Sequence, residues 1–176
     1  KKYFSNTRWL FIIATIIVVV DQITKVLVRR YLPLGEMWNP WEWMMPYARL
    51  IHINNTGAAF RMFKNGNPIF MTLAVIVSRA IIYYYPRVPA NEKLIRFSLS
   101  LQLAGAVGNL IDSIIFGQVT DFVSVGNFAI FNVADSSITV GVAVLLIAVW
   151  WQERNERKKE AAAKSRESAN EAGSDN

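Results

Sequence analysis

The sequence predicts an all-α polytopic membrane protein, with four transmembrane helices and a small extracytoplasmic β-cradle between the first two helices. Hydrophobic residues make up 53% of the 176 residues and charged residues only 18%, which suits a small membrane protein or one large soluble domain. The distribution of the apolar residues separates these classes. Four stretches approach the roughly 20 residues that cross a bilayer core, at about 9–28, 68–85, 94–116 and 131–151. Soluble helices rarely stay apolar all the way round, so residues 1–151 are expected to form a single membrane domain.

The basic residues predict the orientation. They gather before the first span, between the second and third, and after the fourth: Lys1, Lys2 and Arg8; Arg87, Lys93 and Arg96; Arg154, Arg157, Lys158, Lys159, Lys164 and Arg166. The positive-inside rule then places both termini in the cytoplasm. Other basic residues fall on the outer side, at Arg29, Arg30, Arg49, Arg61 and Lys64, whereas the outer loop 117–130 has none. The net charge of +6 forms no basic stripe with stacking aromatics, so no nucleic-acid partner is expected.

The segment 29–67 between the first two spans is too long for a simple turn. Large aromatic and methionine side chains crowd into its middle, at Trp38, Trp41, Trp43, Met44, Met45 and Tyr47. That composition is typical of a segment in the headgroup region. The run Arg49 to Asn54 contains β-branched residues in partial alternation, which predicts a short strand before a turn. We therefore expect residues 29–67 to form an outer cradle with a small sheet.

The two ends of the chain carry separate expectations. The first apolar stretch is too long for a typical signal-peptide core and is followed by no small-residue cleavage site, so it is expected to be a retained span. Residues 152–176 turn polar and are expected to be a cytoplasmic tail, a frayed helix followed by a disordered segment. The chain has no cysteine, which excludes disulfides, thiol nucleophiles and thiolate metal sites. No metal or cofactor is expected.

Ionisable side chains within or beside the spans are costly and are functional candidates. Four acids from three segments reach the outer membrane face in this topology: Asp21, Asp112, Asp121 and Asp135. Three asparagines reach the same level: Asn55, Asn109 and Asn132. Two carboxylates held together in a low-dielectric site share a proton, so one can activate water while the other polarises a carbonyl. These acids and asparagines are therefore compatible with a hydrolytic site, whose substrate their pattern alone does not specify.

Each candidate also has a purely structural interpretation. Asp21 and Lys25, spaced i,i+4, could only neutralise each other. Asn132 and Asp135 could be only an N-cap and a favourable first-turn acid. Asp112 and Asn109, spaced i,i+3, could join helices. Asp121 is harder to explain in this way because it interrupts an apolar run. The single histidine, His52, has no catalytic partner motif and is expected on the outer surface.

Five segments together resemble a known family, lipoprotein signal peptidase (signal peptidase II). They are Val20 to Lys25, Asn55 to Phe60, Gly108 to Asp112, Val119 to Phe122 and Phe131 to Ser137, and they occur in the family's order. The resemblance implies a membrane aspartic endopeptidase of the bacterial inner membrane, with its active site at the extracytoplasmic face and Asp121 and Asp135 as the catalytic pair. It implies cleavage of prolipoproteins before a diacylglyceryl-modified cysteine in phospholipid membranes, and block of this cleavage by globomycin-type inhibitors. We expect the protein to be a monomer.

The same resemblance implies a set of positions that shape or support the substrate pocket: Asp21, Lys25, Asn55, Gly57, Asn109, Asp112, Asn132 and Ala134. One position departs from the family pattern. The family has arginine directly after the aspartate of the third block, and this chain has Ser113. Serine cannot replace the several donors of a guanidinium, so another base would have to compensate, with Arg61 the first candidate.

Two other functions compete with the peptidase. A catalytically weak relative that binds lipidated peptides without cutting them is favoured by Ser113. A small transporter could use Asp21, Asp112 and Asp135 as a proton relay, but it would need acids near mid-membrane and paired broken helices, whereas these acids gather at one face.

Overall fold

The computed structural model describes residues 2–56 and 67–174. Four long helices dominate it: α1 (Lys2–Tyr31), α2 (Asn67–Tyr84), α3 (Lys93–Phe116) and α4 (Val133–Ser174). Each contains a segment long and apolar enough to cross a membrane, at Thr7–Tyr31, Pro68–Arg87, Lys93–Phe116 and Val133–Lys158. The predicted four-span fold is confirmed.

The central helix of the bundle is α3. In its most apolar 18-residue segment, 50% of the residues are buried, compared with 17% to 22% in the corresponding segments of the other three spans. One apolar core joins three helices through Leu10 and Ala14 of α1, Ile81 of α2, and Leu103 and Ala104 of α3. The remaining helix faces expose large apolar side chains such as Ile16, Leu73 and Leu146. Such a surface suits lipid and would be unfavourable in water.

Close packing of α4 against α3 depends on small residues. A Cβ at Gly105 would lie 2.3 Å from the Ala134 carbonyl oxygen and 2.5 Å from Cγ1 of Ile138. Only glycine permits this approach, which is the usual way for membrane helices to bring their backbones together. It fixes the first turn of α4 against the outer half of α3. At the end of α3, Gly117 adopts φ 68°, as suits a left-handed C-cap.

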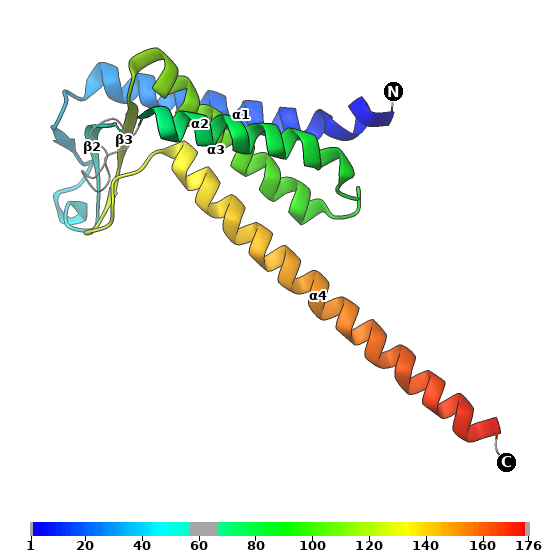
Figure 1. The fold of residues 1–176 in the computed structure, drawn as a ribbon. Coiled ribbons are helices and arrows are strands. Elements are labelled where there is room, and N and C mark those ends of the chain that lie inside the picture. Colours follow the sequence, from blue (N-terminus) through cyan, green and yellow to red (C-terminus); the bar gives the residue numbers. More distant parts are fainter. Residues whose placement is uncertain (1, 57–66, 175–176) are drawn as a thin grey trace.

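A three-stranded antiparallel sheet covers one end of the bundle, with strand order β1-β2-β3 (Figure 1). Its strands are β1 (Met37–Trp38), β2 (Ala48–Asn55) and β3 (Val119–Val125), and short 3₁₀ turns lie at Glu42–Met44 and Tyr85–Arg87. The predicted strand at 49–54 is confirmed within β2. Strand β3 was not predicted, and it comes from the loop between α3 and α4. Its β-branched and aromatic residues favour a strand, and pairing with β2 satisfies its backbone.

The register of the sheet positions the polar residues. Ile53 pairs with Asp121 and Asn55 with Val119, after an irregularity between Leu50 and Ile53. Beyond β3 the chain folds back, and Phe131 exchanges backbone hydrogen bonds with Val123 at 2.8 and 3.0 Å. This return places Asn132, at the start of α4, beside the middle of β3.

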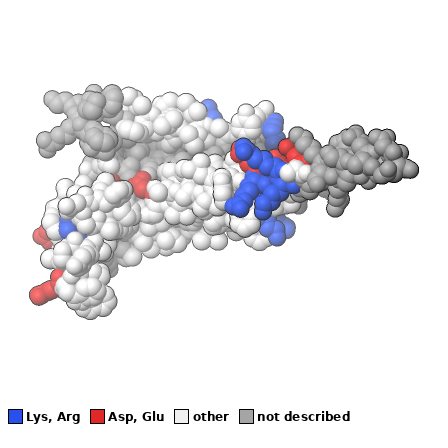
Figure 2. Space-filling model, turned by 90° about the horizontal axis from the view of Figure 1, so that it is seen from below, with Lys and Arg blue, Asp and Glu red and all other residues white. Residues whose placement is uncertain are grey.

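The end of the bundle opposite the sheet carries both termini of the chain, and α4 runs from the sheet toward that end and beyond it (Figure 1). Basic side chains gather there, with few charges along the helical flank (Figure 2). The expectation of a disordered tail differs from the structure, in which α4 continues to Ser174. The segment Glu160–Lys164 reads Glu-Ala-Ala-Ala-Lys, and these are strong helix formers, so the helix does not end where its apolar part ends.

Candidate active site

Asp121 lies in the middle of β3 with 2% of its surface exposed. Its Oδ2 accepts a hydrogen bond from Nδ2 of Asn55 at 2.9 Å, and its Oδ1 accepts one from Nδ2 of Asn132 at 2.7 Å. The first partner comes from the neighbouring strand and the second from the start of α4. Both carboxylate oxygens are therefore fixed by amide donors, one from each side.

Asp135 lies in the first turn of α4 and takes part in a reciprocal cap. Its backbone N–H donates to Oδ1 of Asn132 at 2.9 Å, and its Oδ2 accepts from the backbone N–H of Asn132 at 3.2 Å. This is the capping-box arrangement with aspartate at the third helical position. The other oxygen, Oδ1, accepts from Nδ2 of Asn109 on α3 at 2.7 Å. The capping role and a role in a shared polar site thus coexist in the same side chains.

The two aspartates are joined through two asparagines. Nδ2 of Asn132 donates to Asp121 and also, at 3.1 Å, to Oδ1 of Asn109, while Nδ2 of Asn109 donates to Asp135. Strand β3, helix α3 and helix α4 therefore meet in one hydrogen-bonded chain. Asn132 has no exposed surface, so water does not compete for these bonds. Buried networks with all members satisfied hold their groups in one geometry.

The pKa of Asp121 is raised from its ordinary value of 3.8 to about 6. Burial is the largest cause, because it penalises the charged form. The nearby carboxylate of Asp135 raises it further, while the hydrogen bonds from Asn55 and Asn132 and the charge of Lys25 lower it. Asp121 therefore holds its proton to higher pH than an exposed aspartate, with the second acid close enough to contribute to that shift.

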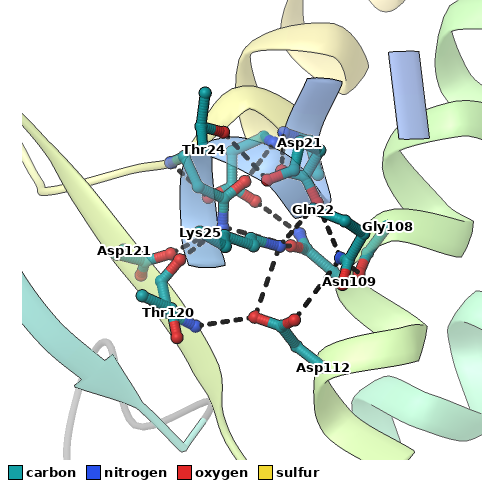
Figure 3. A network of polar contacts seen from close by, with 12 residues as sticks. Asp21, Gln22, Thr24, Lys25, Gly108, Asn109, Asp112, Thr120 and Asp121 are labelled. Atoms are coloured by element: carbon teal, nitrogen blue, oxygen red, sulfur yellow. Dashed lines mark hydrogen bonds and ion pairs between the residues drawn. The ribbon is translucent and has the colours of Figure 1, made fainter. Parts of the chain in front are cut away.

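Lys25 of α1 has no exposed surface and reaches this network through Asn109. Its Nζ contacts Oδ2 of Asp21 at 2.9 Å, Oδ1 of Asn109 at 3.0 Å and Oδ2 of Asp112 at 3.5 Å (Figure 3). One buried ammonium thus neutralises acids from two helices and orients the asparagine that reaches Asp135. A buried charge is tolerated only with such partners.

Asp21 links α1 to the start of α4. Its Oδ1 accepts the backbone N–H of Ala134 at 2.9 Å, one of the N–H groups that a helix leaves without an internal partner. Ala134 has no exposed surface, and a Cβ at Gly108 would lie 2.8 Å from Oδ2 of Asp21. The small residues at 108 and 134 therefore make room for this carboxylate.

Asp112 holds the start of β3 against α3. Its Oδ2 accepts the backbone N–H of Thr120 at 3.0 Å, and Nη1 of Arg29 lies 3.3 Å from the same oxygen. The amide of Gln22 approaches Oδ1 of Asp112 at 3.4 Å and donates to the Gly108 carbonyl at 3.1 Å. Asp112 has no exposed surface, so it acts on β3 from within the bundle.

Most of the predicted site residues meet in this network: Asp21, Lys25, Asn55, Asn109, Asp112, Asp121, Asn132, Ala134 and Asp135. Gly57 and Arg61, predicted as a pocket residue and as a compensating base, lie outside the described residues. The expectation for His52 was wrong: 7% of it is exposed, and its Nδ1 lies 2.8 Å from the Leu32 carbonyl oxygen. It joins β2 to the end of α1 instead of facing solvent.

Three members of the network were not predicted: Gln22, Arg29 and Thr120. Gln22 and Thr120 stand next to predicted site residues in the sequence, and that adjacency could have indicated them. Arg29 lies four residues after Lys25 and so continues its helix face, a spacing that could have placed it in the network. Among the described residues, no group of three or more His, Asp or Glu side chains is arranged to hold a metal ion.

Comparison with known proteins agrees with the fold. Residues 13–151 match the family model described as signal peptidase (SPase) II. Lipoprotein signal peptidases of Staphylococcus aureus strains JH9 and Newman are each 32% identical to this chain over 164 residues, covering 91% of this chain and 98% of theirs.

Two solved structures, both described as bacterial membrane enzymes, have the same fold. Their TM-scores are 0.76 and 0.73 at 29% identity, and the matches cover 83% and 80% of this chain and 90% and 91% of theirs. A four-span fold with these relatives defines a multi-pass bacterial membrane protease. The chain belongs to the signal peptidase II family, the lipoprotein signal peptidases, which cleave lipoprotein signal peptides.

Proposed function

We propose that this protein cuts diacylglyceryl-modified prolipoproteins directly before the lipidated cysteine, with Asp121 and Asp135 as the catalytic pair. The observation that carries this proposal is the paired setting of the two carboxylates. Each is held by asparagine donors from a neighbouring element, and Asn109 and Asn132 join one to the other. A buried Asp121 whose pKa is raised to about 6 suits an acid that must gain and lose a proton near neutral pH.

The chemistry requires only one proton on the pair at the start. The ionised carboxylate takes a proton from a water molecule, whose oxygen attacks the scissile carbonyl carbon, while the protonated carboxyl gives its proton to the carbonyl oxygen. The tetrahedral gem-diol intermediate then collapses and the C–N bond breaks. The departing nitrogen takes up the proton held by the pair, while one hydroxyl of the intermediate returns its proton to the pair, which restores the starting state. One proton shared by the two carboxyl groups is sufficient for this step, and neither residue needs a fixed assignment.

The surrounding network keeps this pair in position. Asp21 and Asp112 each fix a backbone N–H of an element that carries a catalytic residue, at Ala134 and Thr120 respectively. Lys25 balances their charge and orients Asn109. Positioning by rigid neighbours matters because small misplacements of reacting groups cost large factors in rate. These residues are therefore assigned supporting roles.

The membrane setting supports a lipidated substrate. An apolar groove lies between the last turns of α1 and the sheet, lined by Leu27, Val28, Tyr31, Leu32, Trp38 and Leu50. It is close in the chain to Arg29, which belongs to the polar network. The basic side chains at the end opposite the sheet are expected in the cytoplasm, which would put both termini inside and the site at the extracytoplasmic face. A globomycin-type peptide is expected to compete for this site.

The test is cleavage of a fluorescent lipidated reporter peptide by protein purified in detergent. Asp121→Asn and Asp135→Asn should each abolish cleavage with the protein still folded, because an amide keeps the shape but cannot exchange the proton. Glu36→Gln makes the same chemical change at an exposed acid of the outer segment and should retain full activity. Substantial cleavage by either catalytic variant would refute the assignment, and loss of wild-type activity with a chelator would point to a metal-dependent reaction.

Ser113 supports a second candidate, a weak relative that binds lipidated peptides without cutting them. It occupies the position where the family pattern has arginine, and only 7% of it is exposed. The wild-type reporter assay separates the two candidates. Turnover supports the peptidase, whereas saturable binding without turnover supports the weak relative.

A further inference from the structure

Arg29 is the outermost cation of the polar network. It lies one helical turn after Lys25 on α1, and its Nη1 donates to Oγ1 of Thr120 at 2.9 Å. The same nitrogen lies 3.4 and 3.3 Å from the two carboxylate oxygens of Asp112. Its Cζ stands 4.4 Å from the ring centroid of Phe116, within the range of a cation–π contact. The guanidinium is thereby held in one place by three residues.

Two features distinguish Arg29 from the other charged members. Its side chain is 21% exposed, whereas those of Lys25 and Asp112 are fully buried. All its hydrogen bonds use Nη1, and no described residue accepts a hydrogen bond from its Nε or Nη2. A guanidinium carries five N–H donors in a planar fork. Arg29 therefore has a fixed guanidinium on a partly exposed side chain, and its Nε and Nη2 donors are not used by the described residues.

Thr120 connects Arg29 to the strand that carries Asp121. Thr120, which anchors Arg29, directly precedes Asp121, and its carbonyl oxygen lies 3.4 Å from Nδ2 of Asn132. Ser113 directly follows Asp112, the acid that Arg29 contacts. The position that departs from the family pattern is therefore the sequence neighbour of the acid that holds Arg29.

We propose that Arg29 is the substrate-positioning residue of this chain and supplies the donors that Ser113 cannot. Its Nε and Nη2 groups donate to a backbone carbonyl of the lipidated peptide beside the scissile bond, while Asp112, Thr120 and Phe116 hold its Nη1 side. This proposal rests on the proposed function of the site. Arg29 is thus a second candidate for compensation beside Arg61, and it is one that contacts the described network.

A structural role would make Arg29 only a second counter-ion for Asp112. The two roles separate by substitution. Lysine at position 29 keeps the charge that a counter-ion supplies but lacks the planar fork that carbonyl recognition uses. Glutamine removes the charge and keeps a donor. A purely structural residue would change stability and leave kcat/KM per folded molecule unchanged, whereas a positioning residue would change KM.

The experiment is a double-mutant cycle between positions 29 and 113, measured as kcat and KM on the lipidated reporter peptide in detergent. Loss of one charged hydrogen bond corresponds to a decrease of roughly tenfold to a hundredfold in kcat/KM. The kcat/KM of Arg29→Gln should therefore be lower than that of wild type by this factor, mostly because KM rises. Arg29→Lys should remain as stable as wild type, and its kcat/KM should decrease by a smaller factor than that of Arg29→Gln. In the wild-type background, Ser113→Arg should change kcat/KM by less than about threefold. In the Arg29→Gln background, it should raise kcat/KM by about tenfold or more.

Binding supplies a readout that does not depend on turnover. In an Asp135→Asn background, Arg29→Gln should weaken binding of the fluorescent lipidated peptide by the same factor as it raises KM. If the wild type does not cleave but its binding depends on Arg29, the catalytic proposal fails and this inference stands. If Arg29→Gln and Arg29→Lys are folded with unchanged KM and unchanged binding, the inference is overturned. The inference would also be overturned if Ser113→Arg raised kcat/KM by the same factor in the wild-type and Arg29→Gln backgrounds.

Discussion

The two ends of α4 belong to one helix but are held by different forces. At the first end, Asn132 and Ala134 have no exposed surface, and the first N–H groups of the helix are bonded to Asn132 and Asp21. At the other end, the described side chains of residues 152–158 are exposed. One ion pair found there joins Arg157 to Glu153 at 3.8 Å, with 82% and 61% of the side chains exposed. Such pairs contribute little to stability.

The difference shows which end of α4 depends on contacts with the rest of the protein. The start of α4 is fixed by residues distant in the chain, so its geometry depends on α1, α3 and β3 together. At the far end, the exposed side chains of residues 152–158 leave local helix propensity as the main source of order. Substitutions at the first end should therefore change stability and activity together, whereas changes at the far end should leave both nearly unchanged.

The largest effect is expected from Asp21→Ala. It removes the acceptor for the Ala134 N–H and the nearest partner of Lys25. Breaking a buried ion pair by deleting one partner costs about 3–5 kcal/mol, so the melting temperature in detergent should fall strongly. Activity should fall with it, because the first turn of α4 carries Asp135.

Asp21→Asn is the matched control for that variant. It keeps an acceptor for Ala134 and loses only the charge, so its melting temperature should lie between those of Asp21→Ala and wild type. An Asp21→Ala protein with wild-type melting temperature and no activity would contradict a supporting role and indicate that Asp21 takes part in the chemistry.

A smaller effect is expected from the titration of Asp121. Its pKa is raised from 3.8 to about 6 on folding, so the folded state binds more protons than the unfolded state between these values. Stability attributable to this group is therefore highest below about pH 4 and decreases as the pH rises through 6. A shift of this size corresponds to about 3 kcal/mol. Wild-type melting temperature minus that of Asp121→Asn, followed from pH 4 to 7, should decrease across that window.

Other titrating groups are common to both proteins in this comparison, so they cancel to first order. A difference that stays flat from pH 4 to 7 would show that the pKa of Asp121 is not raised. A difference that increases with pH would show that its pKa is lowered, as for an ion-paired aspartate.

The same contrast explains what the sequence could predict. The four spans followed from apolar runs, because a bilayer imposes a length on each helix. The gathering of Asp21, Asp112, Asp121 and Asp135 at one face followed from topology alone. The capping role of Asn132 followed from a local pattern. Each of these features depends on residues close together in the chain or on the membrane as a common reference.

The features that were missed depend on long-range pairing. Strand β3 is stabilised by its register with β2, which no local pattern in 117–130 specified. Arg29 was counted only as a basic residue on the unexpected side, because its contacts with Asp112 and Thr120 join positions more than 80 residues apart. His52 was expected on the surface because its partner is the Leu32 carbonyl, a backbone group that carries no sequence signal. The continuing helix in 152–174 could have been predicted from its Ala, Glu and Lys content.

The smallest effect is expected at the far end of α4. Deletion of residues 162–176 removes a polar helical segment but keeps Arg154, Arg157 and Lys158, the basic residues that are expected to fix topology. Helix propensity is local and cooperative within a few turns, so the span should keep its structure. Cleavage of the lipidated reporter should stay within about twofold of wild type, a change of less than roughly 0.5 kcal/mol, and the melting temperature should be nearly unchanged. Asn132→Ala at the other end provides the contrast, since it removes the cap and a partner of Asp121. If the truncation instead lowered kcat/KM as much as Asn132→Ala does, the far end would have to contact the site or the substrate, and the contrast between the two ends would fail.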